Sequence, residues 1–189
     1  YDANTPPNEF QSVNNPLYWK NRKPFEGYWQ QDVYYKINAT IHEKTNIIEG
    51  NETLTYWNNS PDTLAFVYFH LYQNAFVKGS HLENLNLNNN FKQHFGKYES
   101  ARLGENVSSI SIDGKELKTE LDNTVMKVYL PSPLLPGKNI SFQISFKTYY
   151  DDGDQRRRMK MWNDNGFTHY DGVHWYPRIC VYDRKLGWD

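Results

Sequence analysis

Three stretches in the first half of the chain have the apolar patterns of β-strands. Residues 32–42 (DVYYKINATIH) place Val33, Tyr35, Ile37, Ala39 and Ile41 on one face. This alternation predicts a half-buried strand, because successive side chains of a strand point to opposite faces. Residues 47–59 predict a second strand, with Leu54 and Tyr56 in phase. Residues 64–72 (LAFVYFHLY) are apolar or aromatic almost throughout, which predicts a strand covered on both faces.

The second half of the chain continues this pattern. Asp113-Gly114 separates two short alternating runs and predicts a tight hairpin. Residues 124–131 and 139–150 predict two more strands. The only helical candidate lies within residues 80–95, where Ser80 is a potential N-cap and Glu83 is in capping-box register. The fold class predicted is mostly β: an antiparallel β-sandwich or twisted saddle-like sheet with at most one or two short helices.

Proline and asparagine dominate the start of the chain. Residues 1–27 contain four prolines and many asparagines, which predicts an extended N-terminal arm laid on a β-rich domain of residues 28–189.

The amino-acid composition excludes several classes of protein. The 189 residues include 10 Phe, 15 Tyr and 6 Trp, far more aromatic side chains than a disordered chain carries. The net charge of −1 lacks the basic character that nucleic-acid binding requires. No apolar run approaches the ~20 residues of a membrane span. The single cysteine, Cys180, excludes an internal disulfide, and its apolar neighbours predict an inert, packed thiol.

Two segments resemble a known family. Tyr35–Phe76 contains GNET in its second strand, the turn NNSPDTL and then LYQNAF, and His174–Asp183 reads HWYPRICVYD. In this order, they resemble the N-terminal domain of the aminopeptidase N family of zinc metallopeptidases (gluzincins), in its Bacteroidetes-type form. The resemblance covers about residues 28–189 and implies that this domain continues beyond the end of the given chain.

The resemblance implies a non-catalytic domain that caps the active-site cleft of a downstream catalytic domain, which hydrolyses N-terminal peptide bonds. The family's zinc is held by H-E-x-x-H and a further Glu. His42-Glu43 and His81-Leu82-Glu83 both lack the second histidine, so the zinc ligands are expected outside this chain. The expected partners are that catalytic domain and peptide substrates. The fragment alone is expected to be inactive and metal-free, and the resemblance implies a periplasmic or cell-surface location.

The resemblance also implies a substrate contact. The family's N-terminal domain often supplies a Gln or acidic side chain, shortly before an aromatic-Pro pair, that holds the substrate's α-amino group. Matching Tyr176-Pro177 to that pair without gaps puts Gly166 at this position. The nearest substitutes are Asp171, His169 and Asp164, and a carboxylate suits an ammonium best.

Other chemistry remains possible from the residues alone. His169, Asp171 and His174 have enough donors for zinc, although a polar surface loop is the simpler interpretation. Asp151–Asp154 (DDGD) suggests either calcium or a solvated turn. The pairs Tyr28-Trp29, Tyr56-Trp57 and Trp175-Tyr176 could stack on sugars or fill the core. The alternative function is therefore a stand-alone β-sandwich module that binds glycan or protein.

Overall fold

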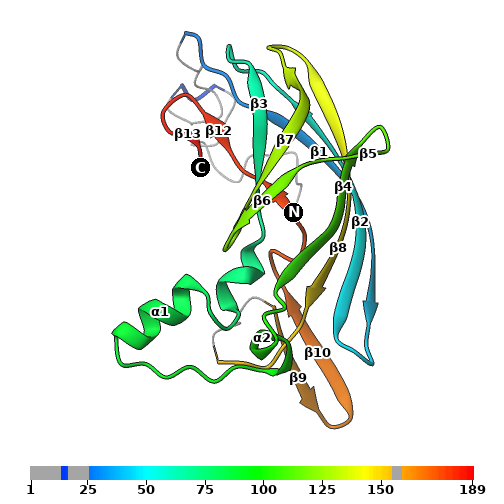
Figure 1. The fold of residues 1–189 in the computed structure, drawn as a ribbon, viewed down its shortest axis with the longest axis vertical. Coiled ribbons are helices and arrows are strands. Elements are labelled where there is room, and N and C mark those ends of the chain that lie inside the picture. Colours follow the sequence, from blue (N-terminus) through cyan, green and yellow to red (C-terminus); the bar gives the residue numbers. More distant parts are fainter. Residues whose placement is uncertain (1–13, 17–25, 155–158) are drawn as a thin grey trace.

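Two antiparallel sheets pack face to face in the computed structural model, which describes residues 14–16, 26–154 and 159–189 (Figure 1). Sheet A contains, in spatial order, β1 (Asp32–His42), β2 (Ile47–Trp57), β8 (Asn139–Tyr149), β4 (Glu105–Ile112) and β5 (Lys115–Glu116). Sheet B contains β11 (Arg178–Ile179), β3 (Leu64–His70), β7 (Val125–Leu134) and β6 (Thr119–Asp122). The predicted antiparallel β-sandwich is confirmed. The predicted arm, residues 1–27, lies almost entirely outside the described residues.

The remaining elements are short. Two ribbons, β9–β10 and β12–β13, and three helical segments complete the described chain. Their bounds are β9 (Met159–Asp164), β10 (Phe167–Gly172), β12 (Tyr182–Asp183), β13 (Gly187–Trp188), 3-10 helix η3 (Tyr72–Phe76), α1 (His81–Asn88) and α2 (Lys97–Ser100). Within the described ranges, no helix has the length and apolar character needed to cross a membrane.

The core lies between the two sheets. Leu54, Phe142 and Ile144 of sheet A face Val67, Phe69 and Val128 of sheet B, and all are at most 2% exposed. The rings of Phe69 and Phe142 meet edge to face, with 5.6 Å between centroids. Burying these side chains supplies the main stabilisation of the sandwich, because each removes a large apolar area from water.

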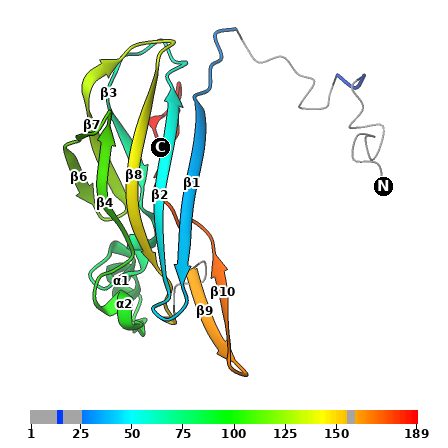
Figure 2. The same cartoon turned by 90° about the vertical axis from the view of Figure 1, so that its right-hand side faces the viewer.

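Strand β1 forms where predicted, but its apolar face is less buried than the alternation suggested. Val33 is 44% exposed and Ile41 is 47% exposed, and only Tyr35 and Ile37 are half-buried. The reason is the width of the second sheet: β11, at its edge, is only two residues long. β1 is the edge strand of sheet A and extends past this cover (Figure 2).

The expectation that both faces of β3 are covered was also wrong. Val67 and Phe69 are fully buried, but Ala65 is exposed and the other outward residues are only half-buried. Individual side chains, not a further layer of structure, cover these outward residues. For example, the Lys127 ammonium lies 4.1 Å from the centroid of the Phe66 ring. A strand in an antiparallel sheet commonly has one solvated face, and aromatic side chains on that face imitate a buried strand in the sequence.

The local turn and helix signals are confirmed. Asp113 and Gly114 have φ values of 49° and 75°, the left-handed pair that a type I′ hairpin turn requires. Helix α1 begins after Ser80, whose Oγ accepts the backbone N–H of Glu83 at 3.3 Å. The Glu83 carboxylate accepts the N–H of Gly79. Both helix-start residues therefore act as N-terminal hydrogen-bond acceptors.

Two glutamates face the core from sheet A. Glu52 and Glu105 are each 2% exposed, and neither carboxylate has a hydrogen-bond partner of standard geometry among the described residues. Burial raises the pKa of Glu52 to about 8. Burial also raises the pKa of Glu105 well above its usual value, although the backbone N–H groups of Gln73 and Tyr72 beside it act in the opposite direction. Both side chains are therefore most stable in the protonated form.

Replacing Glu52 by glutamine should flatten the pH dependence of stability. The folded-state pKa is about 8 against 4.5 for the free side chain, so the folded protein loses stability as pH rises between these values. We expect Glu52→Gln to stabilise the protein by about 2–4 kcal/mol at pH 9 and by little at pH 4. Urea unfolding at several pH values measures this difference. Glu43→Gln, in the exposed turn after β1, is the control, and an equal effect of Glu52→Gln at all pH values would contradict the assignment.

Candidate functional site

The ribbon β9–β10 projects from one end of the sandwich (Figures 1 and 2). Its register pairs Trp162 with His169 and Lys160 with Asp171. Because side chains alternate along a strand, one face carries Met159, Met161, Tyr170 and Gly172, and the other carries Lys160, Trp162, Asp164, Phe167, His169 and Asp171. The first set packs on the body of the protein, and the second set forms what we call the outer face.

The packed face holds the ribbon against the β1–β2 turn. The Tyr170 hydroxyl donates to Asn46 Oδ1 at 2.6 Å, and its ring lies 4.8 Å from that of Tyr150. Met159 is fully buried in a small cluster with Ile48 and Tyr150. Gly172 lies so close to the Tyr150 hydroxyl that any side chain there would collide with it. These contacts fix the ribbon on one side.

The chain leaving the ribbon is held by Gln73 of η3. Its Nε2 donates to the carbonyl oxygens of Val173 at 3.1 Å and His174 at 3.0 Å, and the side chain is fully buried. His174 has a φ of 58°, and its ring stacks on Tyr72 with 4.4 Å between centroids. A left-handed conformation at a residue other than glycine costs free energy, so the surrounding contacts must hold it.

The three predicted site residues share the outer face. Asp164, His169 and Asp171 are all exposed, and the His169 ring lies 5.6 Å from that of Trp162. They form a line: Asp164 is opposite Phe167, four residues from Asp171, which is about 13 Å along a strand. One ammonium group can therefore contact Asp171 or Asp164, but not both.

Gly166, the residue at the family's Gln position in the gapless match, lies at the tip of the ribbon. Asn165 and Gly166 have φ values of 48° and 85°, which is again the left-handed pair of a tight turn. This position has no side chain and lies between β9 and β10. A glutamine at this position would be strained by the left-handed backbone.

The metal interpretations are not supported by the geometry. No group of three His, Cys, Asp or Glu side chains in the described part of the chain is arranged to hold a metal ion. His169 and Asp171 lie on the outer face, whereas His174 stacks on Tyr72 at the base of the ribbon. His169, Asp171 and His174 therefore do not fit a catalytic zinc, which needs three protein ligands on one side of the metal.

Asp151 belongs neither to a calcium loop nor to a solvated turn. It is 2% exposed, and its Oδ2 accepts the backbone N–H groups of Tyr98 at 2.7 Å and Glu99 at 2.8 Å. Asp154 accepts the N–H of His94 at 2.7 Å. The DDGD segment thus caps the start of α2, and its acidic residues satisfy backbone donors.

Several side chains of the aromatic pairs pack against other rings, although Tyr28 is 50% exposed. Trp175 and Tyr176 contact Phe146 and Tyr35, with centroids 6.1 and 5.5 Å apart. Trp29 stacks on Tyr182, with 5.6 Å between the ring centroids.

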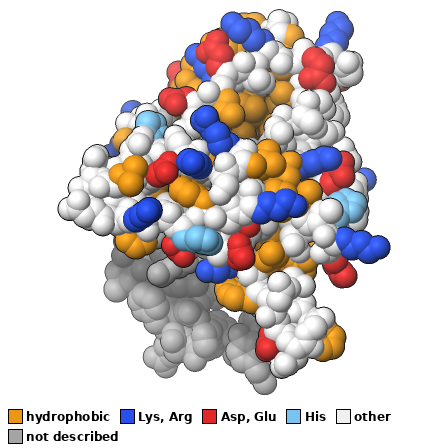
Figure 3. Space-filling view, turned by 60° about the horizontal axis from the view of Figure 1, so that its bottom comes forward, with side chains coloured by type: hydrophobic (Ala, Val, Ile, Leu, Met, Phe, Trp, Pro, Cys, Tyr) orange, Lys and Arg blue, Asp and Glu red, His pale blue; other side chains and the backbone are white. Residues whose placement is uncertain are grey.

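The space-filling view shows apolar patches on the surface, with charged side chains of both signs around them (Figure 3).

No protein-family model matches the chain, and no curated protein matches it significantly. Among solved structures, it is similar to the M1 zinc metallopeptidase from Deinococcus radiodurans, with 18% identity, a TM-score of 0.48 and 80% of this chain matched to 29% of that chain. A mutant of that enzyme bound to a Tyr-Ser-Ala substrate has the same identity and TM-score. A two-domain M1 zinc metallopeptidase mutant bound to L-arginine gives a TM-score of 0.46 over 79% of this chain, again at 18% identity, and 29% of that chain is covered. The chain thus spans less than a third of the length of these structures.

Replacing Gln73 by methionine tests how the ribbon is held. The change keeps the length of the side chain but leaves two carbonyl oxygens without their donor, so we expect a loss of about 1–3 kcal/mol in stability. Hydrogen exchange should quicken first in residues 159–174, because their anchor is lost. Gln143→Met, at an exposed site on β8, is the matched control. Unchanged protection of the ribbon would show that Gln73 does not hold it.

Proposed function

We propose that this chain is the non-catalytic N-terminal domain of a zinc aminopeptidase of the Bacteroidetes-type aminopeptidase N family, and that it caps the active-site cleft of a downstream catalytic domain. The observation that carries the proposal is an uncovered apolar surface. Trp162 and Phe167, neighbours on the outer face of the ribbon, are 44% and 80% exposed. Soluble domains rarely leave large apolar side chains together in water, so a further domain is the natural cover.

The contact between the two family-like segments supports this proposal. Gln73, in LYQNAF, binds the carbonyl oxygen of His174, which begins HWYPRICVYD. β3 pairs with β11, and the Tyr35 hydroxyl accepts the N–H of Ile179 at 3.1 Å. The segments that carry the resemblance therefore form one structural unit, and that unit positions the ribbon.

Within the proposed enzyme, the outer face of the ribbon forms part of the substrate-pocket wall. Asp171 is the residue that we propose binds the peptide's α-ammonium through charge-assisted hydrogen bonds, with His169 and Asp164 further along the same face. Zinc, held by the catalytic domain, would activate the attacking water. The contribution of this chain is to bind and orient the N-terminus of the peptide and to limit access to it.

A longer polypeptide tests the parent activity directly. We expect the gene to encode H-E-x-x-H downstream, and the longer product to release N-terminal residues from peptides. A zinc chelator should abolish this activity, and added Zn²⁺ should restore it. Peptidase assays and metal analysis provide the measurements. A reading frame without a catalytic domain, or turnover by the 189-residue chain itself, would refute the proposal.

Asp171→Asn in that longer polypeptide tests the ammonium contact. Removing one carboxylate should raise KM for peptides with a free α-amino group roughly 10-fold or more, because a charge-assisted hydrogen bond contributes about 1.5–3 kcal/mol. Any slow cleavage of N-acetylated peptides should not change. Asp164→Asn, at the other end of the outer face, is the matched control. Equal effects of both variants would place the ammonium elsewhere.

The stand-alone module has less support. Its proposed platforms, Trp29 and the Trp175-Tyr176 pair, already stack on or pack against other rings of the protein. Binding to glycans by the isolated chain, lost in Trp29→Ala or Trp57→Ala, would instead favour that function.

A further inference from the structure

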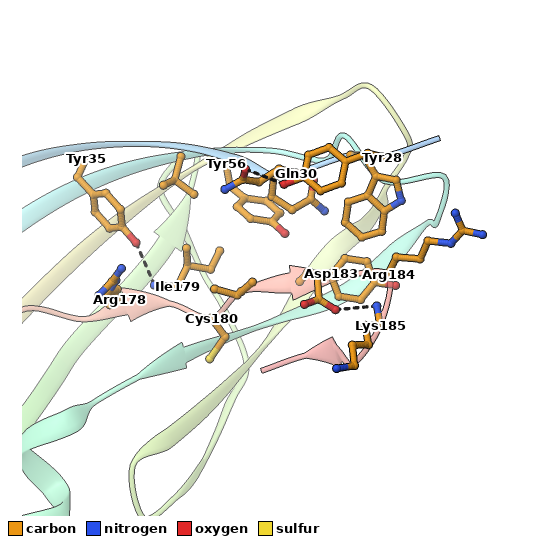
Figure 4. Close-up of a pocket in the computed structure, with 15 residues that line it drawn as sticks. Tyr28, Gln30, Tyr35, Tyr56, Arg178, Ile179, Cys180, Asp183, Arg184 and Lys185 are labelled. Carbon is orange, nitrogen blue, oxygen red and sulfur yellow. Dashed lines mark hydrogen bonds between the residues drawn. The ribbon is translucent and has the colours of Figure 1, made fainter. Parts of the chain in front are cut away.

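A cavity of about 450 Å³ lies between the start of β1 and the C-terminal segment that contains β11 and β12 (Figure 4). It shares no residue with the outer face of the ribbon. Cavities of roughly 300–1,000 Å³ accommodate small organic ligands. The volume therefore suits a molecule with one ring and a short side group.

The walls of the cavity are largely aromatic. Tyr35 closes one end through its hydrogen bond to the N–H of Ile179, and Trp29 stacks on Tyr182 at the other. The remaining apolar lining comes from Val33, Tyr56, Ile179, Cys180 and Val181. Burial raises the pKa of Cys180 to about 12, so its thiol stays protonated and contributes packing rather than chemistry. A flat apolar ring is the group that such walls accommodate best.

The polar groups at the rim favour an anion. Arg178, Arg184 and Lys185 line the cavity together with one carboxylate, that of Asp183. A second carboxylate, that of Asp62 behind the wall, accepts the Tyr182 hydroxyl at 2.8 Å. Asp183 Oδ1 already accepts the backbone N–H groups of Lys185 at 2.8 Å and Leu186 at 2.7 Å. Figure 4 shows Arg178 near Tyr35, with Arg184 and Lys185 at the far end. The excess of cations gives the rim a positive potential for a carboxylate.

Tyr56 contributes its ring, and not its hydroxyl, to the inner wall. Its side chain is 1% exposed, and the Gln31 carboxamide lies beside its hydroxyl. The hydroxyl lies below the accessible surface, so a ligand in the cavity meets only apolar atoms there.

We propose that the cavity is a binding site for a small aromatic carboxylate, with the ring against the Trp29–Tyr182 stack and the carboxylate at the cationic rim. The site is separate from the proposed substrate contact at Asp171 and does not depend on peptidase activity. Its recognition combines apolar burial with charge, so both the ring and the negative charge of the ligand are required.

Three matched ligands test the proposal on the 189-residue chain: 3-phenylpropionate, its neutral amide and phenethylamine. We expect 3-phenylpropionate to bind with a Kd of about 1 mM or tighter, and the amide at least roughly 10-fold more weakly. Phenethylamine should bind most weakly, because the rim repels a cation. NMR shifts locate the ligand, and they should concentrate at Ile179 and Val181. Equal binding of all three ligands, no binding at about 10 mM, or shifts elsewhere would overturn the proposal.

Variants separate the two parts of the recognition. Trp29→Ala should weaken binding of 3-phenylpropionate at least roughly 10-fold through loss of the ring contact. Arg184→Gln with Lys185→Gln changes only exposed side chains and should remove most of the preference for the carboxylate over the amide. Trp162→Ala, on the ribbon, is the control and should leave binding unchanged. A preference for the carboxylate that survives the double substitution would contradict the role of the rim.

Discussion

The position of the ribbon depends on one buried carboxamide. Gln73 binds two successive carbonyl oxygens, of Val173 and His174, where the chain turns from β10 toward β11. Without these bonds, the carbonyl groups would be buried without donors, and the left-handed backbone of His174 would lose its support. The other anchors, such as Tyr170 on Asn46, hold the ribbon only along its packed face. The two hydrogen bonds of Gln73 therefore determine the orientation of the outer face that carries Asp171.

Local sequence patterns predicted most of the fold. Alternation located β1, β2, β7 and β8, Asp113-Gly114 gave a hairpin turn, and Ser80 gave the start of α1. The β9–β10 ribbon was not predicted, because a polar surface loop was expected around His169 and Asp171. The extent of burial was harder to predict, because it depends on which strands cover which. The alternation in β1 is real, yet Val33 and Ile41 remain exposed, since the opposing sheet ends at a two-residue strand. No window of sequence around β1 contains that information.

The site was predicted only in part. Asp164, His169 and Asp171 were chosen by distance from Tyr176-Pro177, and the β9–β10 register does place all three on one face. Gln73 was missed as a determinant of the site, because its partners are about a hundred residues away and are backbone atoms. Asp151 was also misjudged: an acidic run normally indicates a solvated turn, but here a carboxylate caps a helix contributed by an earlier segment. Such long-range pairings have no local signature in the sequence.

The strand order of sheet A has a consequence for how the chain folds. β2 lies between β1 and β8, and Leu54 of β2 is paired with Phe142 of β8, far along the chain. Closing so large a loop costs entropy before its contacts form, which makes folding slow. On the ribosome, β1 and β2 emerge long before β8. Their inward-facing apolar side chains therefore remain solvent-exposed until β8 has been synthesised. The apolar face of β2 is therefore exposed for longest during early synthesis, when exposed apolar surface favours aggregation.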